Sequence, residues 1–327
     1  MPIRSLVLAT VLGVHVQGGV TPDDALRRSF ERRSGVNVIA ILEQLSPRGD
    51  NAYVRLKMWR DATGKRRTEI LSPVDMQGQV SVDDGTTWTT YFPDARRVRF
   101  HPSALLAPDD LDTRFHLLRR NYHLDIDEHS VVAGRNVVRV VARPRTPDLE
   151  TRRFYIDTAT FVPLKAESVN DLGGVTVQFA VRHIEFPSRF DKGVFEPMQP
   201  SGVRYDKAQP PVPLRRLDEA ERRLGFHPVY PTHLPMGFRP LGMEAVDWHG
   251  MRRLAIRLTD GLVPLFVYQS RPSDNPPPPP RPGDEQKTFR DVGDLRVEVR
   301  GDAPTAVRER ILAVYARFMA ASRIPAP

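Results

Sequence analysis

The feature that most constrains the fold of this chain is a series of short segments in which apolar and polar residues alternate. Val54, Leu56 and Met58 fall on one side of such a segment. Arg55 and Lys57 fall on its other side. A period of two residues is that of a β-strand with one buried face. Because tight turns join these segments, the pattern predicts an antiparallel sheet with one apolar and one arginine-rich face.

The strands expected in this sheet are short and close together in sequence. They cover residues 36–43, 52–60, 65–71, 79–82, 86–92, 96–100, 131–133, 136–142, 152–157, 163–169 and 175–186. Thr21-Pro22-Asp23-Asp24 offers a capping side chain, a proline suited to a first turn and acids at the positive helix end, so a helix is expected to about Arg33. A second helix follows from apolar residues at helical spacing: Leu111, Phe115, Leu118 and Tyr122.

A proline-rich polar stretch, residues 198–213, predicts a linker to a second unit. That unit should hold a short helix ended by Gly225, five strands and a final amphipathic helix. We therefore expect an α+β protein whose N-terminal sheet curves into a half-barrel with covering helices, followed by a small C-terminal α+β domain. The expected boundaries are 1–19 for a signal peptide, 20–197 for the half-barrel, 198–213 for the linker and 214–323 for the second domain.

The first residues have the character of an export signal. One positive charge precedes an apolar run of about 12 residues, which is too short to span a bilayer as a helix. His15 interrupts the run, so a first buried strand is the alternative interpretation. We expect an exported protein of the periplasm or cell envelope.

Composition and charge exclude some functions and leave others open. The chain of 327 residues has no cysteine, which excludes disulfides and thiolate metal sites. Its net charge of +8 attracts anions of any kind. Arginine pairs are spread evenly through both units, which favours a solvated basic surface over a nucleic-acid site. A peripheral contact with a membrane is compatible with this surface. Five consecutive prolines, Pro276–Pro280, predict a stiff surface loop, with a ligand for another domain as the alternative.

No catalytic or metal-binding motif is present in the sequence. The nine histidines show no metal-ligand spacing with a carboxylate, and the common hydrolase, Walker and dinucleotide motifs are missing. We therefore expect no cofactor, no metal, no catalytic residue and no enzymatic activity.

The apolar face of the predicted sheet is the candidate binding site. A curved sheet closed by only two helices leaves apolar surface uncovered, which favours a ligand cavity, whereas simple core packing is the alternative. The residues expected to line the cavity are Leu56, Met58, Ile70, Trp88, Phe92, Leu118, Phe154, Leu164 and Phe179.

Three segments of the first unit resemble the LolA/LolB-type lipoprotein carriers. The segment 80–94, VSVDDGTTWTTYFPD, resembles a hairpin of that family with a glycine turn, Trp and Tyr, and a Pro-Asp turn. Segments 117–124 and 132–140 resemble the helix-to-strand passage that follows. The segment 153–165, RFYIDTATFVPLK, resembles a later hairpin of the same family.

Three segments of the second unit narrow the resemblance to RseB/MucB-type regulators of sigma-E. The segment 230–238, YPTHLPMGF, resembles the entry to their C-terminal domain. Thr259-Asp-Gly-Leu262 and Val299-Arg-Gly-Asp302 fall where that domain has its later turns. The resemblance extends over about residues 25–320, and the order of the motifs carries it.

The resemblance implies a binding function. RseB-type proteins bind the periplasmic part of an anti-sigma factor and release it when lipid or misfolded envelope protein binds, so the expected partners are an acyl chain or lipoprotein and such an anti-sigma factor. A lipoprotein or lipid carrier of LolA type is the first alternative, because such carriers hold acyl chains in a half-barrel. A non-catalytic envelope scaffold with a filled core is the second.

Overall fold

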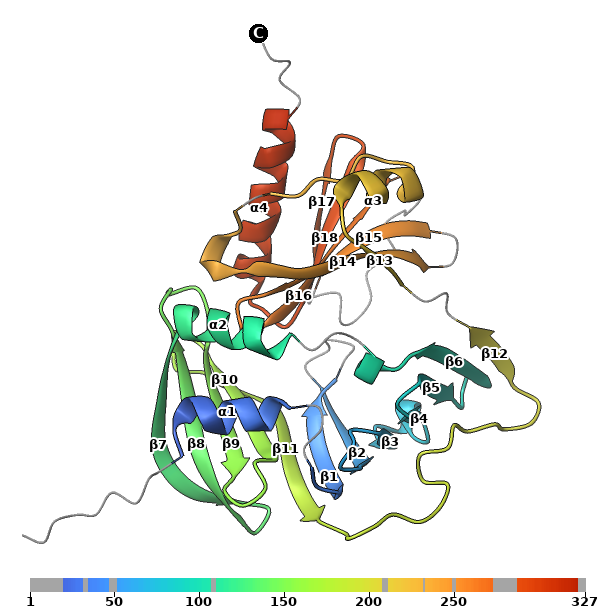
Figure 1. The fold of residues 1–327 in the computed structure, drawn as a ribbon, viewed down its shortest axis with the longest axis vertical. Coiled ribbons are helices and arrows are strands. Elements are labelled where there is room, and N and C mark those ends of the chain that lie inside the picture. The colour runs from blue at the N-terminus through green and yellow to red at the C-terminus, as the bar shows by residue number, and fades with distance from the viewer. Residues whose placement is uncertain are drawn as a thin grey trace, which may run out of the picture.

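The structure is a computed structural model, and it describes residues 20–31, 35–46, 52–106, 110–207, 211–231, 233–248, 251–272 and 287–322. The predicted signal, residues 1–19, and the predicted polyproline loop lie outside these residues. Two sheets dominate the described part of the chain, one of twelve strands and one of six (Figure 1). Helices pack on both, so the chain has the α+β class predicted from the sequence.

The large sheet is a meander in which almost every strand pairs with its neighbour in sequence. Its strand order is β12-β6-β5-β4-β3-β2-β1-β11-β10-β9-β8-β7. Its strands are β1 (Val38–Leu45), β2 (Tyr53–Arg60), β3 (Arg66–Ser72), β4 (Val80–Asp83), β5 (Thr87–Phe92), β6 (Arg97–Pro102), β7 (Tyr122–Val132), β8 (Arg135–Pro144), β9 (Thr151–Asp157), β10 (Pro163–Val169), β11 (Val175–Glu185) and β12 (Arg204–Lys207). All pairs are antiparallel except β12 with β6, which is parallel.

Two helices cover one face of this sheet at the β7–β9 side (Figure 1). The first, α1 (Pro22–Phe30), is capped by Thr21, whose hydroxyl accepts a hydrogen bond from the Asp24 amide at 3.1 Å. The second, α2 (Leu111–Asn121), lies beside it, and Arg119 donates to Asp23 of α1 at 2.9 Å. Short 3-10 helices cover Val74–Met76 and Ala104–Leu106.

The second unit is a six-stranded sheet with two further helices. Its strand order is β13-β14-β15-β16-β18-β17. The strands are β13 (Val212–Leu214), β14 (Arg239–Trp248), β15 (Met251–Thr259), β16 (Pro264–Ser270), β17 (Lys287–Val292) and β18 (Leu295–Gly301). The helices are α3 (Leu217–Leu224), α4 (Thr305–Ser322) and a 3-10 helix, η3 (Pro235–Gly237). As predicted, Gly225 ends α3, in the left-handed region with φ 77°.

One apolar core runs through both units. It holds Leu26 of α1 and Phe115 of α2. It continues into the second sheet at Ile256 and into α4 at Ile311 and Tyr315. All five side chains are at most 1% exposed. The two units are therefore joined by packing as well as by the chain.

The structure differs from the sequence predictions at several element ends. Tyr122, predicted on the α2 stripe, adopts extended backbone with φ −131° and begins β7. The strand predicted at 131–133 overlaps only the end of this longer β7, which runs to Val132. The segment predicted as a linker contains β12 and β13, which pair with the large and small sheets respectively. The domain boundaries themselves stay a prediction.

Replacing Phe115 tests the shared core. The side chain is 1% exposed, and its ring centroid lies 6.0 Å from that of Phe30. We expect Phe115→Ala to lower the free energy of unfolding by about 3–5 kcal/mol, because it leaves a cavity that the packed helices fill only in part. Arg120→Ala on the exposed side of α2 is the matched control and should change stability by less than about 0.5 kcal/mol. Urea unfolding followed by circular dichroism measures both, and similar losses would contradict the packing described.

Candidate functional site

Eight of the nine residues predicted to line a cavity share one face of the large sheet, and the ninth, Leu118, lies on α2. Paired residues of adjacent strands lie on the same face. Leu56 pairs with Ile70 and with Leu42 of β1. Leu42 pairs in turn with Val181, and Phe179 lies two residues before Val181 on the same face. Phe154 is on this face too, because its partner Ala166 also pairs with Phe179. The alternation in the sequence therefore assigned these residues to a common face.

This face does not gather the nine residues around one point. Leu118 and Phe154 belong to the core beneath α1 and α2. A second cluster, around β1, β2 and β11, contains Leu56, Met58, Leu164 and Phe179. Ile70 packs in a third with Val54 and Met76. Leu118 and Leu164 are 0% exposed, so in this conformation they are packed core residues. Ligand binding by the other members of the set stays a prediction.

The two remaining residues, Trp88 and Phe92, stand outside these clusters and contact arginines. The Arg66 guanidinium lies 5.3 Å from the Trp88 ring centroid. Those of Arg97 and Arg99 lie 5.1 and 5.6 Å from the Phe92 centroid. The face is therefore mostly apolar from β7 to β2, whereas on β5 its aromatic rings contact arginines of β3 and β6. The sequence did not predict this division, because the strands of both halves share the same period.

The opposite face of the large sheet carries a lattice of charges. Glu167 is only 6% exposed and accepts a hydrogen bond from the Tyr155 hydroxyl at 3.0 Å. Its second oxygen lies 2.5 Å from the Lys165 ammonium. Burial alone would raise the pKa of Glu167, but these contacts hold that pKa below its usual value. Ion pairs thus stabilise this part of the opposite face.

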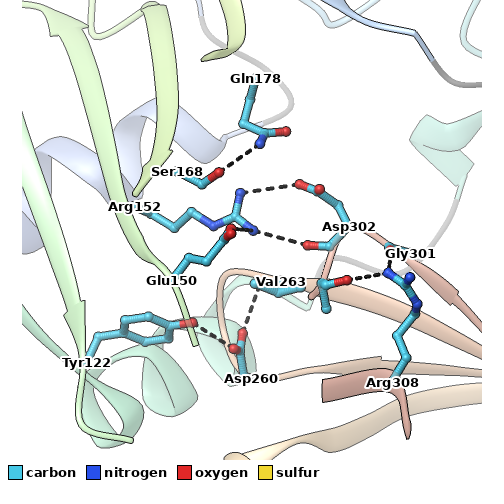
Figure 2. Close-up of polar contacts among 11 residues, drawn as sticks. Tyr122, Glu150, Arg152, Ser168, Gln178, Asp260, Val263, Gly301, Asp302 and Arg308 are labelled. Atoms are coloured by element: carbon cyan, nitrogen blue, oxygen red, sulfur yellow. Dashed lines mark hydrogen bonds and ion pairs between the residues drawn. The ribbon is translucent and has the colours of Figure 1, made fainter. Parts of the chain in front are cut away.

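The contact between the two units centres on a buried carboxyl group (Figure 2). Asp260, in the turn after β15, is 0% exposed and accepts a hydrogen bond from the Tyr122 hydroxyl at 2.7 Å. Its other oxygen accepts the backbone amides of Leu262 and Val263 at 2.9 and 2.8 Å. Burial raises the pKa of Asp260, against the opposing effect of these donors. The Asn121 amide adds a bond to the Asp260 carbonyl at 2.7 Å.

Two glycines allow the second unit to approach α2 closely. Gly261 has φ +112°, and a Cβ there would lie 2.4 Å from the Leu118 backbone nitrogen. Gly237, in η3, has φ +75°, and its Cβ would lie 2.2 Å from the Asn121 side-chain oxygen. Any larger residue at Gly261 would push the turn away from the backbone of α2. Gly261 is therefore required by the contact with the α2 backbone as well as by the turn, whereas at Gly237 the positive φ favours glycine and the Asn121 side chain could move aside.

Ion pairs surround this contact. Arg152 of β9 is 7% exposed, and its guanidinium donates to the Asp302 carboxylate at 3.3 Å and to the Asp302 carbonyl at 3.1 Å (Figure 2). Glu150 lies 3.6 Å from the same guanidinium. Arg310 of α4 pairs with Asp148. Charges from both units thus flank the buried Tyr122–Asp260 pair.

The sequence motifs of the second unit lie at this contact. Segment 230–238 includes η3, Thr259–Leu262 includes Asp260 and Gly261, and Val299–Asp302 includes the partner of Arg152. Their role in joining the units was not predicted, since a turn motif does not reveal what packs against it. Tyr122 and Arg152 carried no sequence signal beyond their strand and helix positions.

The described residues contain no group of three or more His, Asp or Glu side chains placed to hold a metal ion. None of their helices has the length and apolar character needed to cross a bilayer.

Comparison with known proteins gives a consistent match for both units. Residues 48–199 match the family model of the MucB/RseB N-terminal domain. The crystal structure of MucB aligns with 91% of this chain and 98% of its own, at 17% identity and a TM-score of 0.61. The Pseudomonas aeruginosa MucA/MucB complex aligns with 89% of this chain and 96% of that chain, at 16% identity and a TM-score of 0.59. No curated protein sequence matches significantly.

The match to MucB confirms the resemblance predicted from the sequence motifs. The family model covers most of the large sheet, from before β2 to beyond β11. The structural alignment extends to the second unit, so the chain shares the two-unit fold of MucB. At this level of identity the shared property is the fold.

Removing one hydroxyl tests the Tyr122–Asp260 contact. We expect Tyr122→Phe to destabilise the protein by about 1–3 kcal/mol, because the buried carboxyl group loses its side-chain donor. Since burial raises the pKa of Asp260, the cost of the carboxylate appears as pH rises from about 3.9 through the folded pKa. The loss should therefore be larger at neutral pH than near the ordinary aspartate pKa.

Tyr53→Phe is the control for this variant. Its hydroxyl donates to the Val177 carbonyl at 3.0 Å, but the residue is 45% exposed. Urea unfolding at several pH values measures both variants. Equal losses, or a loss in Tyr122→Phe that is independent of pH, would contradict a buried ionisable partner.

Proposed function

We propose that the protein is an exported, periplasmic regulator that binds the extracytoplasmic part of a membrane anti-sigma factor. The observation that carries this proposal is the likeness to MucB over both units, at a TM-score of 0.61. A match to MucB in complex with MucA(peri) covers 89% of this chain at 16% identity and a TM-score of 0.59. RseB/MucB-type proteins bind the periplasmic part of an anti-sigma factor, and the shared fold supports the same class of partner here.

The joined units favour regulation over simple transport. A carrier needs only the large sheet and its helices, whereas here the second unit packs on α2 through a buried carboxyl group. A ligand that moves α1 or α2 on the sheet would act directly on this contact, because Tyr122 begins β7 immediately after α2. The arrangement thus supplies a physical route from the sheet face to the second unit.

The finer part of the proposal is that the large sheet forms a half-barrel that holds an acyl chain or lipoprotein. Met58 and Phe179 are only partly buried at the edge of their cluster, and they would contact such a chain. A carrier of LolA type uses the same face and is the alternative. A scaffold with a filled core is the second alternative, which the full burial of Leu164 favours. In each case the proposed role is non-catalytic.

Direct binding tests the proposed partner. The purified full chain should bind the extracytoplasmic segment of an anti-sigma factor from the same organism with a Kd of about 1 μM or tighter, measured by calorimetry. Because a net charge of +8 attracts acidic peptides unspecifically, the control is a scrambled peptide of equal composition. Equal affinities for the two peptides, or no binding, would reject the regulatory role.

Lipid that copurifies with the protein tests whether the apolar face of the large sheet binds acyl chains. Mass spectrometry of protein isolated gently from the envelope should find acyl chains bound to the wild type. Phe179→Glu should lose them while remaining folded, because a charge on a partly exposed edge residue repels an acyl chain. Tyr53→Glu, on the opposite face, should keep them. A lipid-free wild type, or a Phe179→Glu variant that unfolds, would favour the filled core.

A further inference from the structure

Two arginines stand directly opposite each other on the helix-covered face of the large sheet. Arg60, the last residue of β2, pairs in register with Arg66, the first residue of β3. Val38 pairs with Arg60 on the other side, and Asp83 pairs with Arg66. Like charges directly opposite in a sheet repel each other, so this pairing destabilises the hairpin unless something compensates.

The Arg60 guanidinium has polar atoms without partners. Its Nε and one terminal nitrogen are buried, and no acceptor among the described residues bonds either atom. Burial, with a smaller effect of Arg66, lowers the pKa of Arg60, and burial lowers that of Arg66 against the attraction of Asp83. Both side chains keep some exposure to solvent. A guanidinium that is desolvated and unpaired costs free energy in the unliganded protein.

The two nearby acids each use one oxygen in a turn. Asp61 follows Arg60, but one of its oxygens accepts the amides of Thr63 and Lys65 and the Thr63 hydroxyl in the β2–β3 turn. Asp83 stands opposite Arg66 in register, and one of its oxygens accepts the Gly85 amide at 3.1 Å. Two partly buried guanidinium groups thus stand beside one carboxylate in register with them.

We propose that Arg60 and Arg66 form a binding site for a phosphate group, supplied either by a free ion or by the head of an amphiphile. A guanidinium offers a planar fork of donors that fits phosphate oxygens in a bidentate way. Two forks at cross-strand distance match a group with several acceptor oxygens and about two negative charges. The Trp88 ring, 5.3 Å from the Arg66 guanidinium, holds that side chain against the sheet.

The surroundings allow both sources of phosphate. Arg60 adjoins the apolar cluster through Val38 on β1 and Met58 on its own strand. An amphiphile would place its head on the arginines and its chain toward Met58. Binding of an amphiphile rests on the proposed acyl-chain site, whereas binding of a free phosphate ion does not. The uncharged diacylglyceryl group of a lipoprotein would leave Arg60 unpaired.

Calorimetry on the full chain tests the site with three probes: inorganic phosphate, dioctanoyl phosphatidic acid and uncharged dioctanoylglycerol. Arg60→Gln and Arg66→Gln should each weaken binding of the two phosphate probes by about tenfold or more, because a charge-assisted bidentate contact is lost. Arg55→Gln is the matched control, since Arg55 lies on the same strand, is exposed and points to the other face. It should leave both affinities unchanged.

The probes separate the two sources. Phosphatidic acid that binds about tenfold tighter than phosphate identifies an amphiphile head, and equal affinities identify a free ion. If the protein binds inorganic phosphate but neither lipid probe, the proposed acyl-chain site is wrong and the phosphate site is not contradicted. The proposed Arg60–Arg66 site is wrong if neither phosphate probe binds saturably. It is also wrong if Arg55→Gln weakens binding as much as Arg60→Gln and Arg66→Gln do.

Thermal unfolding guards against a variant that merely misfolds. Because the Arg60 guanidinium lacks partners, Arg60→Met should unfold at a temperature no lower than the wild type in phosphate-free buffer. Added phosphate should raise the unfolding temperature of the wild type and not that of Arg60→Met. A large drop in the unfolding temperature of Arg60→Met, or an equal rise of both with phosphate, would mean that Arg60 has a structural role instead.

Discussion

The burial of Asp260 against Tyr122 is the interaction on which the arrangement of the two units depends. A carboxyl group with 0% exposure is tolerated only when its oxygens are satisfied, and here donors come from its own turn and from the first unit. Separating the units would remove the Tyr122 donor and expose the apolar core that runs from α1 to α4. The glycine at 261 permits this contact, since a Cβ would meet the backbone of α2.

The large sheet has two unlike halves. The half from β7 to β2 is covered by α1 and α2, and its apolar side chains pack in continuous clusters. The half from β3 to β6 lies away from these helices, and its side of the face carries Arg66, Arg97 and Arg99 against aromatic rings. A ligand with an apolar part and an anionic part would match the border between the halves. The second unit reaches the same sheet through α2, so binding and regulation would meet at that helix.

Much of the fold was predictable because its interactions are local in sequence. A meander pairs consecutive strands, so alternation and turns predict both the strands and their order. The helix cap at Thr21 and the glycine end of α3 were predicted for the same reason. The errors fell where distant packing prevails. Tyr122 fits a helical stripe, but its hydroxyl bonds Asp260 and its backbone starts β7. The predicted linker contains β12 and β13, because strands far away in sequence supply their partners.

The sequence by itself determined the α+β class, the common face of eight predicted residues and the resemblance to the MucB/RseB family. Each follows from short-range periodicity or from the order of motifs. Only the tertiary structure decided that Leu118 and Leu164 are packed core, that Tyr122 and Asp260 join the units, and that Arg60 and Arg66 stand opposed. The physical reason is that burial and pairing are properties of residues distant in sequence or set by strand register, and alternation alone does not reveal which side chains lack a partner.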